Sequence, residues 1–267
     1  MLLIDRRANL PQEISEVIDT AKRNCRERLA KGDVEAARNA FDDLRETKDS
    51  IKESLLLEQH GLCAYCMQRI QRRTARIEHW RPLSKNTEEA LEYANMFVVC
   101  FGGEKPEEPL EGSRQGQGKK GLCCDASKGN REITINPSDS GQMEMICYSD
   151  DDVFIYTATH DKDLERDIND VLHLNGVKKD GVLVCDTKTN LVYHRRQVYT
   201  ALKGYLENLQ KKECTPEKIS IAIKKKIMSI ENEEIYPPFA GVLLYFLRRE
   251  LKRYEKLHCG AVSNPYI

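Results

Sequence analysis

The cysteines between residues 63 and 124 constrain the fold of this chain more than any other feature of its sequence. Cys63 and Cys66 have the CxxC spacing that lets two thiolates on one tight turn bind one tetrahedral metal ion. The N-terminal residues lack the apolar run of a signal peptide, and no segment has the length of a membrane span, so we expect a cytoplasmic protein with reduced thiols. In that setting, clustered cysteines favour metal binding over disulfides.

A second pair of thiolates must complete such a site, and Cys100, Cys123 and Cys124 are the candidates. We predict a structural zinc ion held by Cys63, Cys66, Cys100 and Cys124, because four thiolates leave no open position for a water ligand. The 23 residues from 101 to 123, which include a Gly-, Glu-, Lys- and Pro-rich loop, split the second pair. Cys123 therefore remains an alternative fourth ligand. A redox CxxC is disfavoured, because the strand and helix context of redox motifs is missing.

Residues with catalytic chemistry lie between and after these cysteines. Glu78 and His79 are adjacent in the sequence Arg76-Ile-Glu-His-Trp-Arg-Pro-Leu83, and Asn95 precedes the apolar run that ends at Cys100. Asp125 and Lys128 follow Cys124 directly. The order CxxC, acidic-His, Asn, Cys, Cys-Asp-x2-Lys is far more specific than any one of its parts.

This order resembles the motif of the HNH (ββα-metal) endonucleases, in which CxxC is followed by Asp/Glu-His-x2-Pro, an Asn and a second CxxC-Asn/Asp-x2-Lys. Glu78 to Pro82, Asn95 and Cys124 to Lys128 match its elements. The segments Ile168–Asn175 and Val192–Arg196 look like the C-terminal half of HNH proteins of the bacterial Septu and retron anti-phage systems (the PtuB type). The resemblance implies a phosphodiester hydrolase, with an ABC-type ATPase (PtuA-like) as its partner and, in the retron case, a reverse transcriptase with its DNA.

The chemistry of phosphodiester cleavage assigns roles to these residues. Glu78 and Asp125 are the carboxylates expected to hold catalytic Mg²⁺ or Mn²⁺, and His79 is the expected general base. Asn95 is expected to orient the loop or His79 rather than to contact the metal. Adjacent residues of a strand point to opposite faces, so Glu78 and His79 can share a site only at a strand end or a bulge.

The expected nucleic-acid contacts are local, because the net charge of the chain is only −1. Arg73, Arg76, Arg81 and Lys128 surround the motif and are predicted to bind nucleic acid. Lys128 could equally be a solvated helix lysine. A second basic run, from 188 to 226, has 10 Lys/Arg against 3 Asp/Glu and could follow a phosphate backbone. The sequence does not distinguish DNA from RNA.

Hydrophobic periodicity predicts an α+β, mainly helical fold in three parts. An N-terminal helical arm covers 1–60, with helices from 12 to 30 and from 33 to 59. The zinc-stapled core covers 61–135. Short strands are expected between 133 and 160, across the boundary with the last part, 136–267. This part then has helices over 164–174, 190–211, 216–229 and 238–257, and it could dock a partner protein.

A zinc-stapled binding module without catalytic activity is the alternative function. Such a module has no need for Glu78, His79 and Asp125 together, so their joint presence favours the enzyme.

Overall fold

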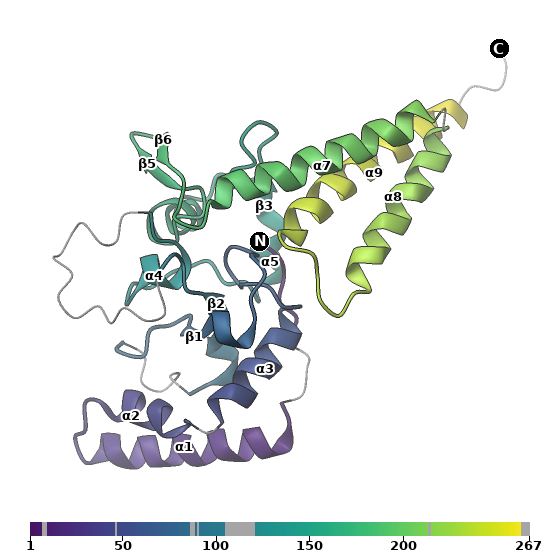
Figure 1. The fold of residues 1–267 in the computed structure, drawn as a ribbon. Coiled ribbons are helices and arrows are strands. Elements are labelled where there is room, and N and C mark those ends of the chain that lie inside the picture. The colour runs from purple at the N-terminus through teal and green to yellow at the C-terminus, as the bar shows by residue number, and fades with distance from the viewer. Residues whose placement is uncertain are drawn as a thin grey trace.

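A computed structural model describes residues 1–6, 10–45, 47–85, 89, 91–104, 121–212 and 215–262. The fold is mixed α+β and about half helical, with three two-stranded antiparallel sheets in this described part of the chain. Figure 1 shows helices α1 to α3 on one side of the small sheet β1–β2 and helices α7 to α9 extending away on another. One cluster of buried apolar side chains runs from Met1 to Tyr254, so the three predicted parts share a continuous core.

The N-terminal arm consists of helices α1 (Gln12–Ala30), α2 (Ala36–Asp43) and α3 (Lys48–Glu58). The sequence predicted one helix from 33 to 59, which is wrong, because the chain turns between α2 and α3. The physical reason is packing: α2 lies on α1, whereas α3 contacts strand β2 and the turn η1 (Arg72–Thr74). One straight helix could not cover both surfaces.

The central unit is built from strands β1 (Ala75–His79) and β2 (Met96–Cys100), followed by the short helix α4 (Cys124–Lys128). The strands pair antiparallel, with Ala75 opposite Cys100 and His79 opposite Met96. All five residues of β2 are buried, which explains its unbroken apolar sequence. Turn η2 (Tyr93–Asn95) leads into β2, and α4 contacts that strand. Most of the loop predicted between 101 and 121 lies outside the described residues.

Strands β3 (Ile146–Tyr148) and β4 (Ile155–Thr157) form the predicted hairpin around Ser149 to Asp152, after the short helix α5 (Ser140–Met145). The strand expected at Ile133 and Ile135 is absent from the structure. Both side chains are buried, but the N–H groups of Thr134 and Ile135 donate to the carboxylate of Asp167 instead of to a neighbouring strand. The alternating apolar residues Ile133 and Ile135 thus reflect burial of their side chains and not strand pairing.

The helix predicted over 164–174 is shorter and changes form. It consists of α6 (Lys162–Arg166) and a π-helical turn, η3 (Asp167–Val171). A further hairpin, β5 (Val177–Lys179) with β6 (Val182–Cys185), was not predicted. Its turn residues Asp180 and Gly181 both have positive φ, and Asp-Gly is the usual sequence signal for such a turn.

Helices α7 (Leu191–Lys211), α8 (Pro216–Glu231) and α9 (Ala240–Val262) are the last elements of the described residues and extend from the body together (Figure 1). Thr215 caps α8 by accepting a hydrogen bond from the N–H of Lys218, with Pro216 at the first helical position as predicted. The α9 helix starts inside the core, where a side chain in place of Gly241 would meet Met67 and Tyr148. No helix among the described residues is long and apolar enough to cross a membrane.

Candidate active site and metal centre

Four cysteine side chains converge in the interior of the central unit. The Sγ atoms of Cys63 and Cys124 lie 3.8 Å apart, and those of Cys66 and Cys100 lie 3.7 Å apart. All four possible ligand atoms lie within 4.8 Å of one another, and all four residues are buried. This cluster, Cys63, Cys66, Cys100 and Cys124, could hold a structural metal ion such as zinc. A fully thiolate-lined, buried site has no position for a reacting water, so it suits a structural role.

The structure selects Cys124 rather than Cys123 for this cluster. The Sγ atom of Cys123 contacts Thr189 Oγ1 at 3.4 Å, although its thiol remains close enough to the cluster for neighbouring thiols to lower its pKa to about 5. The two ends of the segment 101–123 meet, because Cys123 N donates to Gly102 O at 3.0 Å. Gly102 has φ +60°, and a Cβ there would lie 2.1 Å from Cys123 O, so only glycine fits. The segment 101–123 therefore returns to its starting point, so Cys100 and Cys124 on either side of it can both belong to the cluster.

Strand β1 ends at the point where its last two residues enter one cavity. Glu78 and His79 both line a cavity of about 380 Å³, together with Asp125 from α4. The alternation of a strand would separate Glu78 from His79, but His79 is the final residue of β1, and the chain turns away immediately after it. The sequence allowed two adjacent residues to share one site only at a strand end or a bulge. Glu78 and His79 do so at the end of β1.

Asn95 holds the turn that follows His79. Its Oδ1 atom accepts a hydrogen bond from Arg81 N at 2.8 Å, its Nδ2 atom donates to Arg81 O at 3.1 Å, and its backbone carbonyl accepts from Trp80 N at 2.9 Å. Asn95 is buried and is not among the residues that line the cavity. It therefore acts on the loop, as an orienting residue.

The two carboxylates of the cavity each have a cationic neighbour. Lys128 Nζ lies 2.5 Å from Glu78 Oε1, and Arg76 Nη1 lies 3.4 Å from Asp125 Oδ2. Burial, followed by the neighbouring Asp125 carboxylate, raises the pKa of Glu78 well above its usual range, against the opposing effect of Lys128. A buried carboxylate whose ionised form is disfavoured beside a second carboxylate is a donor set that a divalent cation stabilises.

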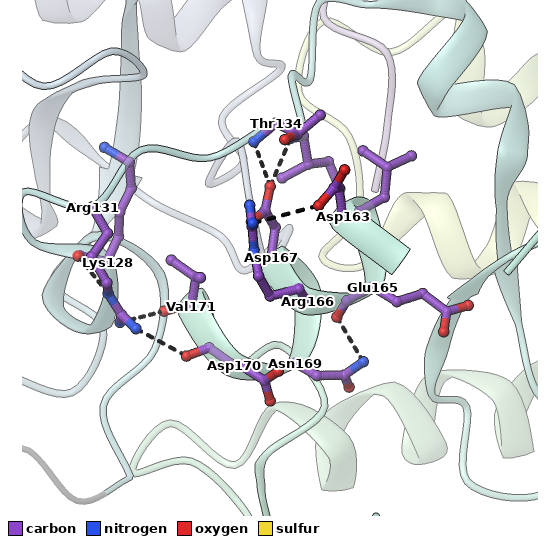
Figure 2. A network of polar contacts seen from close by, with 12 residues as sticks. Lys128, Arg131, Thr134, Asp163, Glu165, Arg166, Asp167, Asn169, Asp170 and Val171 are labelled. Atoms are coloured by element: carbon purple, nitrogen blue, oxygen red, sulfur yellow. Dashed lines mark hydrogen bonds and ion pairs between the residues drawn. The ribbon is translucent and has the colours of Figure 1, made fainter. Parts of the chain in front are cut away.

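Helix α4 has only five residues, so other groups must fix it. Arg131 does so from just beyond its end: Nε donates to Lys128 O at 3.1 Å, and Nη1 and Nη2 donate to Asp170 O and Val171 O, both at 3.1 Å. Figure 2 shows this bridge from α4 to η3, with the Asp167 carboxylate holding Thr134 on the other side of η3. The position of Asp125 on α4 thus depends on contacts with η3, which comes later in the sequence.

The predicted nucleic-acid residues take different positions. Arg73 and Arg81 are exposed, and Arg81 pairs with Glu89. Arg76 is half-buried and contacts the acids Glu104 and Asp125. The expectation of a solvated Lys128 is wrong, since this residue is 2% exposed and sits behind Glu78. None of the four lines the cavity.

The cationic residues of the basic run from 188 to 226 are also not all exposed to solvent. Arg195 is fully buried, and its Nη2 atom donates to Asn175 Oδ1 at 3.1 Å, while Nε and Nη1 have no hydrogen-bond partner among the described residues. Burial lowers the pKa of this guanidinium to about 10. The run therefore offers fewer phosphate contacts than its charge count suggested.

Sequence reasoning missed the contribution of the N-terminal arm. Val34, Glu35, Ala37 and Arg38 form one wall of the cavity. Phe41 packs edge-on against the His79 ring, with centroids 4.6 Å apart and an interplanar angle of 85°. The sequence contains no local signal for this contact, because α2 and β1 are separate in the chain and meet only through the packing of α1 to α3.

Neither the models of known protein families nor the curated protein sequences match this chain.

Proposed function

We propose that this protein is a metal-dependent endonuclease of the HNH (ββα-metal) type, which hydrolyses phosphodiester bonds in nucleic acid. The observation that carries the proposal is the shared cavity of Glu78, His79 and Asp125 at the end of β1. A histidine and two carboxylates in one cavity provide a base and a place for a hard divalent cation, the two needs of phosphodiester hydrolysis.

The order of the surrounding elements supports the resemblance found in the sequence. Two antiparallel strands, β1 and β2, precede the short helix α4, and the cysteine cluster joins the CxxC turn to the end of β2 and the start of α4. The strand–strand–helix order with a cysteine staple is what the HNH resemblance implies. We assign zinc to the cluster, because a closed set of four thiolates is the usual structural zinc site.

Glu78 and Asp125 are the residues that would hold Mg²⁺ or Mn²⁺. Among the described residues, only the four cysteines form a converging group of three or more possible metal ligands. A cation in the cavity would therefore have only the carboxylates of Glu78 and Asp125 as protein ligands. Such a sparse set suits Mg²⁺, which keeps several water ligands and adds substrate phosphate oxygens. When bound, the cation would neutralise charge on the phosphate and on the leaving oxygen.

The residues of the chain supply the remaining chemistry. His79 accepts the proton of the attacking water, and Phe41 and the strand end fix the plane of its ring. Lys128 holds both Glu78 and the His79 backbone in place, since its ammonium also donates to His79 O at 2.9 Å. Asn95 keeps the turn after His79 closed.

The resemblance to Septu and retron proteins further suggests an effector nuclease in anti-phage defence, with an ABC-type ATPase partner. Helices α7 to α9 extend from the body and are the part of the fold best placed to dock such a partner (Figure 1). The outer side of α8 carries the exposed apolar residues Ile221 and Met228 beside lysines. Protein docking and phosphate binding at this face differ in salt dependence, because phosphate contacts weaken steeply with salt.

The test is cleavage of plasmid DNA and of total RNA by purified protein with Mg²⁺, with and without such an ATPase. Replacing His79→Ala should lower the rate by about 10²–10⁴-fold or more, with folding and zinc content unchanged. His160→Ala is the matched control, because this exposed histidine pairs with Glu165 away from the cavity. Wild-type rates in His79→Ala would refute the site. Nucleic-acid binding without cleavage under all these conditions would favour the silent binding module.

A further inference from the structure

The cavity of Glu78, His79 and Asp125 is also lined by a cation from the N-terminal arm. Arg38 of α2 lines this cavity, whereas the other cations next to the carboxylates, Arg76 and Lys128, do not. Arg38 is exposed, so it can reach a molecule in the cavity. This side chain lies 40 residues before Glu78 in the sequence, outside the motif that identified the site.

Packing of the arm fixes where Arg38 lies. Ala36, Ala37 and Ala40 of α2 are fully or almost fully buried, and small side chains allow a helix to approach its neighbours closely. Phe41 then contacts His79. Residues three apart are neighbours on a helix surface, so Arg38 lies beside the residue that touches the candidate base.

Arg38 also differs from the nearby cations in its charge environment. Lys128 is paired with Glu78 and Arg76 with Asp125 and Glu104. Within the described part of the chain, Arg38 has no ion pair or hydrogen bond. Glu35, one turn before it, is the acid on the same wall. A guanidinium held at a cavity without a carboxylate partner is suited to an anion supplied by a ligand.

We propose that Arg38 binds a phosphate of the nucleic-acid backbone across the cavity from Glu78 and Asp125, so that the N-terminal arm forms half of the substrate-binding site. This inference rests on the proposed function and adds to it the arm as a substrate clamp. The planar guanidinium can take two phosphate oxygens at once, whereas the carboxylates of Glu78 and Asp125 repel phosphate unless a cation lies between them. Substrate is then held between α2 and the end of β1.

The test measures binding of a short fluorescent DNA duplex, and of RNA of the same sequence, to protein that carries His79→Ala to prevent cleavage. Affinity is recorded over a series of salt concentrations in Mg²⁺. Arg38→Ala should weaken binding about tenfold and reduce the slope of log affinity against log salt by about 1, because one phosphate contact is lost. Arg38→Lys should retain part of the affinity, since the charge stays while the bidentate geometry is lost.

Arg45→Ala is the matched control, because Arg45 is exposed on the same arm but does not line the cavity. It should bind like the parent protein. If the wild type cleaves and Arg38→Ala binds with the affinity and salt slope of Arg45→Ala, the inference is wrong and the proposed function stands. If the wild type neither binds nor cleaves nucleic acid in Mg²⁺, the proposed function and the inference fail together.

Discussion

Lys128 and Glu78 form a buried ion pair, with Nζ 2.5 Å from Oε1 and both side chains almost inaccessible to solvent. The same ammonium donates to the carbonyl of His79 at 2.9 Å. One cation at the end of α4 therefore fixes two consecutive residues at the end of β1. This contact ties the geometry of the candidate active site to its stability, because a charged group in the interior needs its partner.

Replacing Lys128→Met should lower the free energy of unfolding by about 3–5 kcal/mol at neutral pH, since Glu78 is then buried without its partner. Protonation of Glu78 in acid should relieve part of this loss. Chemical denaturation at two pH values measures both effects. Lys85→Met is the control: Lys85 is exposed and lies 3.8 Å from Glu132, so its loss should change stability by less than about 1 kcal/mol. Equal effects of the two substitutions would contradict a structural role for the Lys128 pair.

Removal of one cluster thiolate should unfold the central unit. Cys63→Ser should lose the bound metal and much of the fold, because structural zinc can contribute about 10 kcal/mol or more. Cys123→Ser should keep one zinc per chain, since the Cys123 thiol lies outside the four-residue cluster. Elemental analysis of purified variants and circular dichroism after addition of a chelator provide the measurements. Folded wild-type protein without zinc would show that the cluster assignment is mistaken.

Asp125→Asn should raise the Mg²⁺ concentration needed for half-maximal cleavage by about tenfold, because one of two carboxylates is lost. The substitution also removes a carboxylate that raises the pKa of Glu78, so the remaining acid should ionise more readily. A Mg²⁺ titration of the cleavage rate tests this. Glu132→Gln, an exposed acid that contacts Lys85, is the comparison variant and should keep the wild-type requirement. An unchanged requirement in Asp125→Asn would exclude Asp125 as a ligand.

Asp150 should stabilise the attachment of α9 in a pH-dependent manner. Arg249 donates to both of its oxygens, at 2.6 and 3.0 Å, and Tyr199 donates at 2.9 Å, so hydrogen bonds from Arg249 lower the pKa of Asp150. A folded-state pKa below the ordinary value of 3.8 means that the stabilisation is present above about pH 4 and disappears as the pH falls through the folded-state pKa.

Asp150→Asn should therefore be less stable than wild type by about 0.5–1 kcal/mol near pH 7, a small effect because the pair is partly exposed to solvent. The difference should shrink in acid. Thermal unfolding from neutral pH to pH 3 measures the trend, with exposed Asp151→Asn as the control. A difference that stays constant over this range would mean that the ionised form of Asp150 contributes nothing.

Local patterns in the sequence were sufficient for several parts of the molecule. The CxxC pair with Cys100 and Cys124 predicted the cluster, because metal ligation requires particular residue types at short spacings. The cap at Thr215 and Pro216 predicted the start of α8, and the hydrophobic periodicity from 12 to 30 predicted α1. The helix cap and the helix periodicity depend on interactions within a few residues. The cluster depends on the strong preference of cysteine thiolates for binding metal ions.

Other features depend on contacts between distant segments. The sequence favoured Cys124 as the fourth ligand but left Cys123 as an alternative, and the structure places the Cys124 thiol in the cluster and the Cys123 thiol against Thr189. It left Lys128 as either a phosphate contact or a solvated helix lysine, whereas in the structure Lys128 is buried and pairs with Glu78. Ile133 and Ile135 have the burial of a strand, but the Asp167 carboxylate takes the hydrogen bonds that a strand would make.

The sequence by itself determined which residues carry chemistry: the four cysteines, and the motif of Glu78, His79, Asn95 and Asp125. Only the tertiary structure decided how a cavity forms around them. Arg38 lines it and Phe41 contacts His79 because α2 packs on α1 while α3 packs on β2, and Arg131 fixes α4 through carbonyls of η3. Residue chemistry is a local property that a motif can record, whereas the walls of a cavity come from segments whose proximity is set by the burial of the whole apolar core.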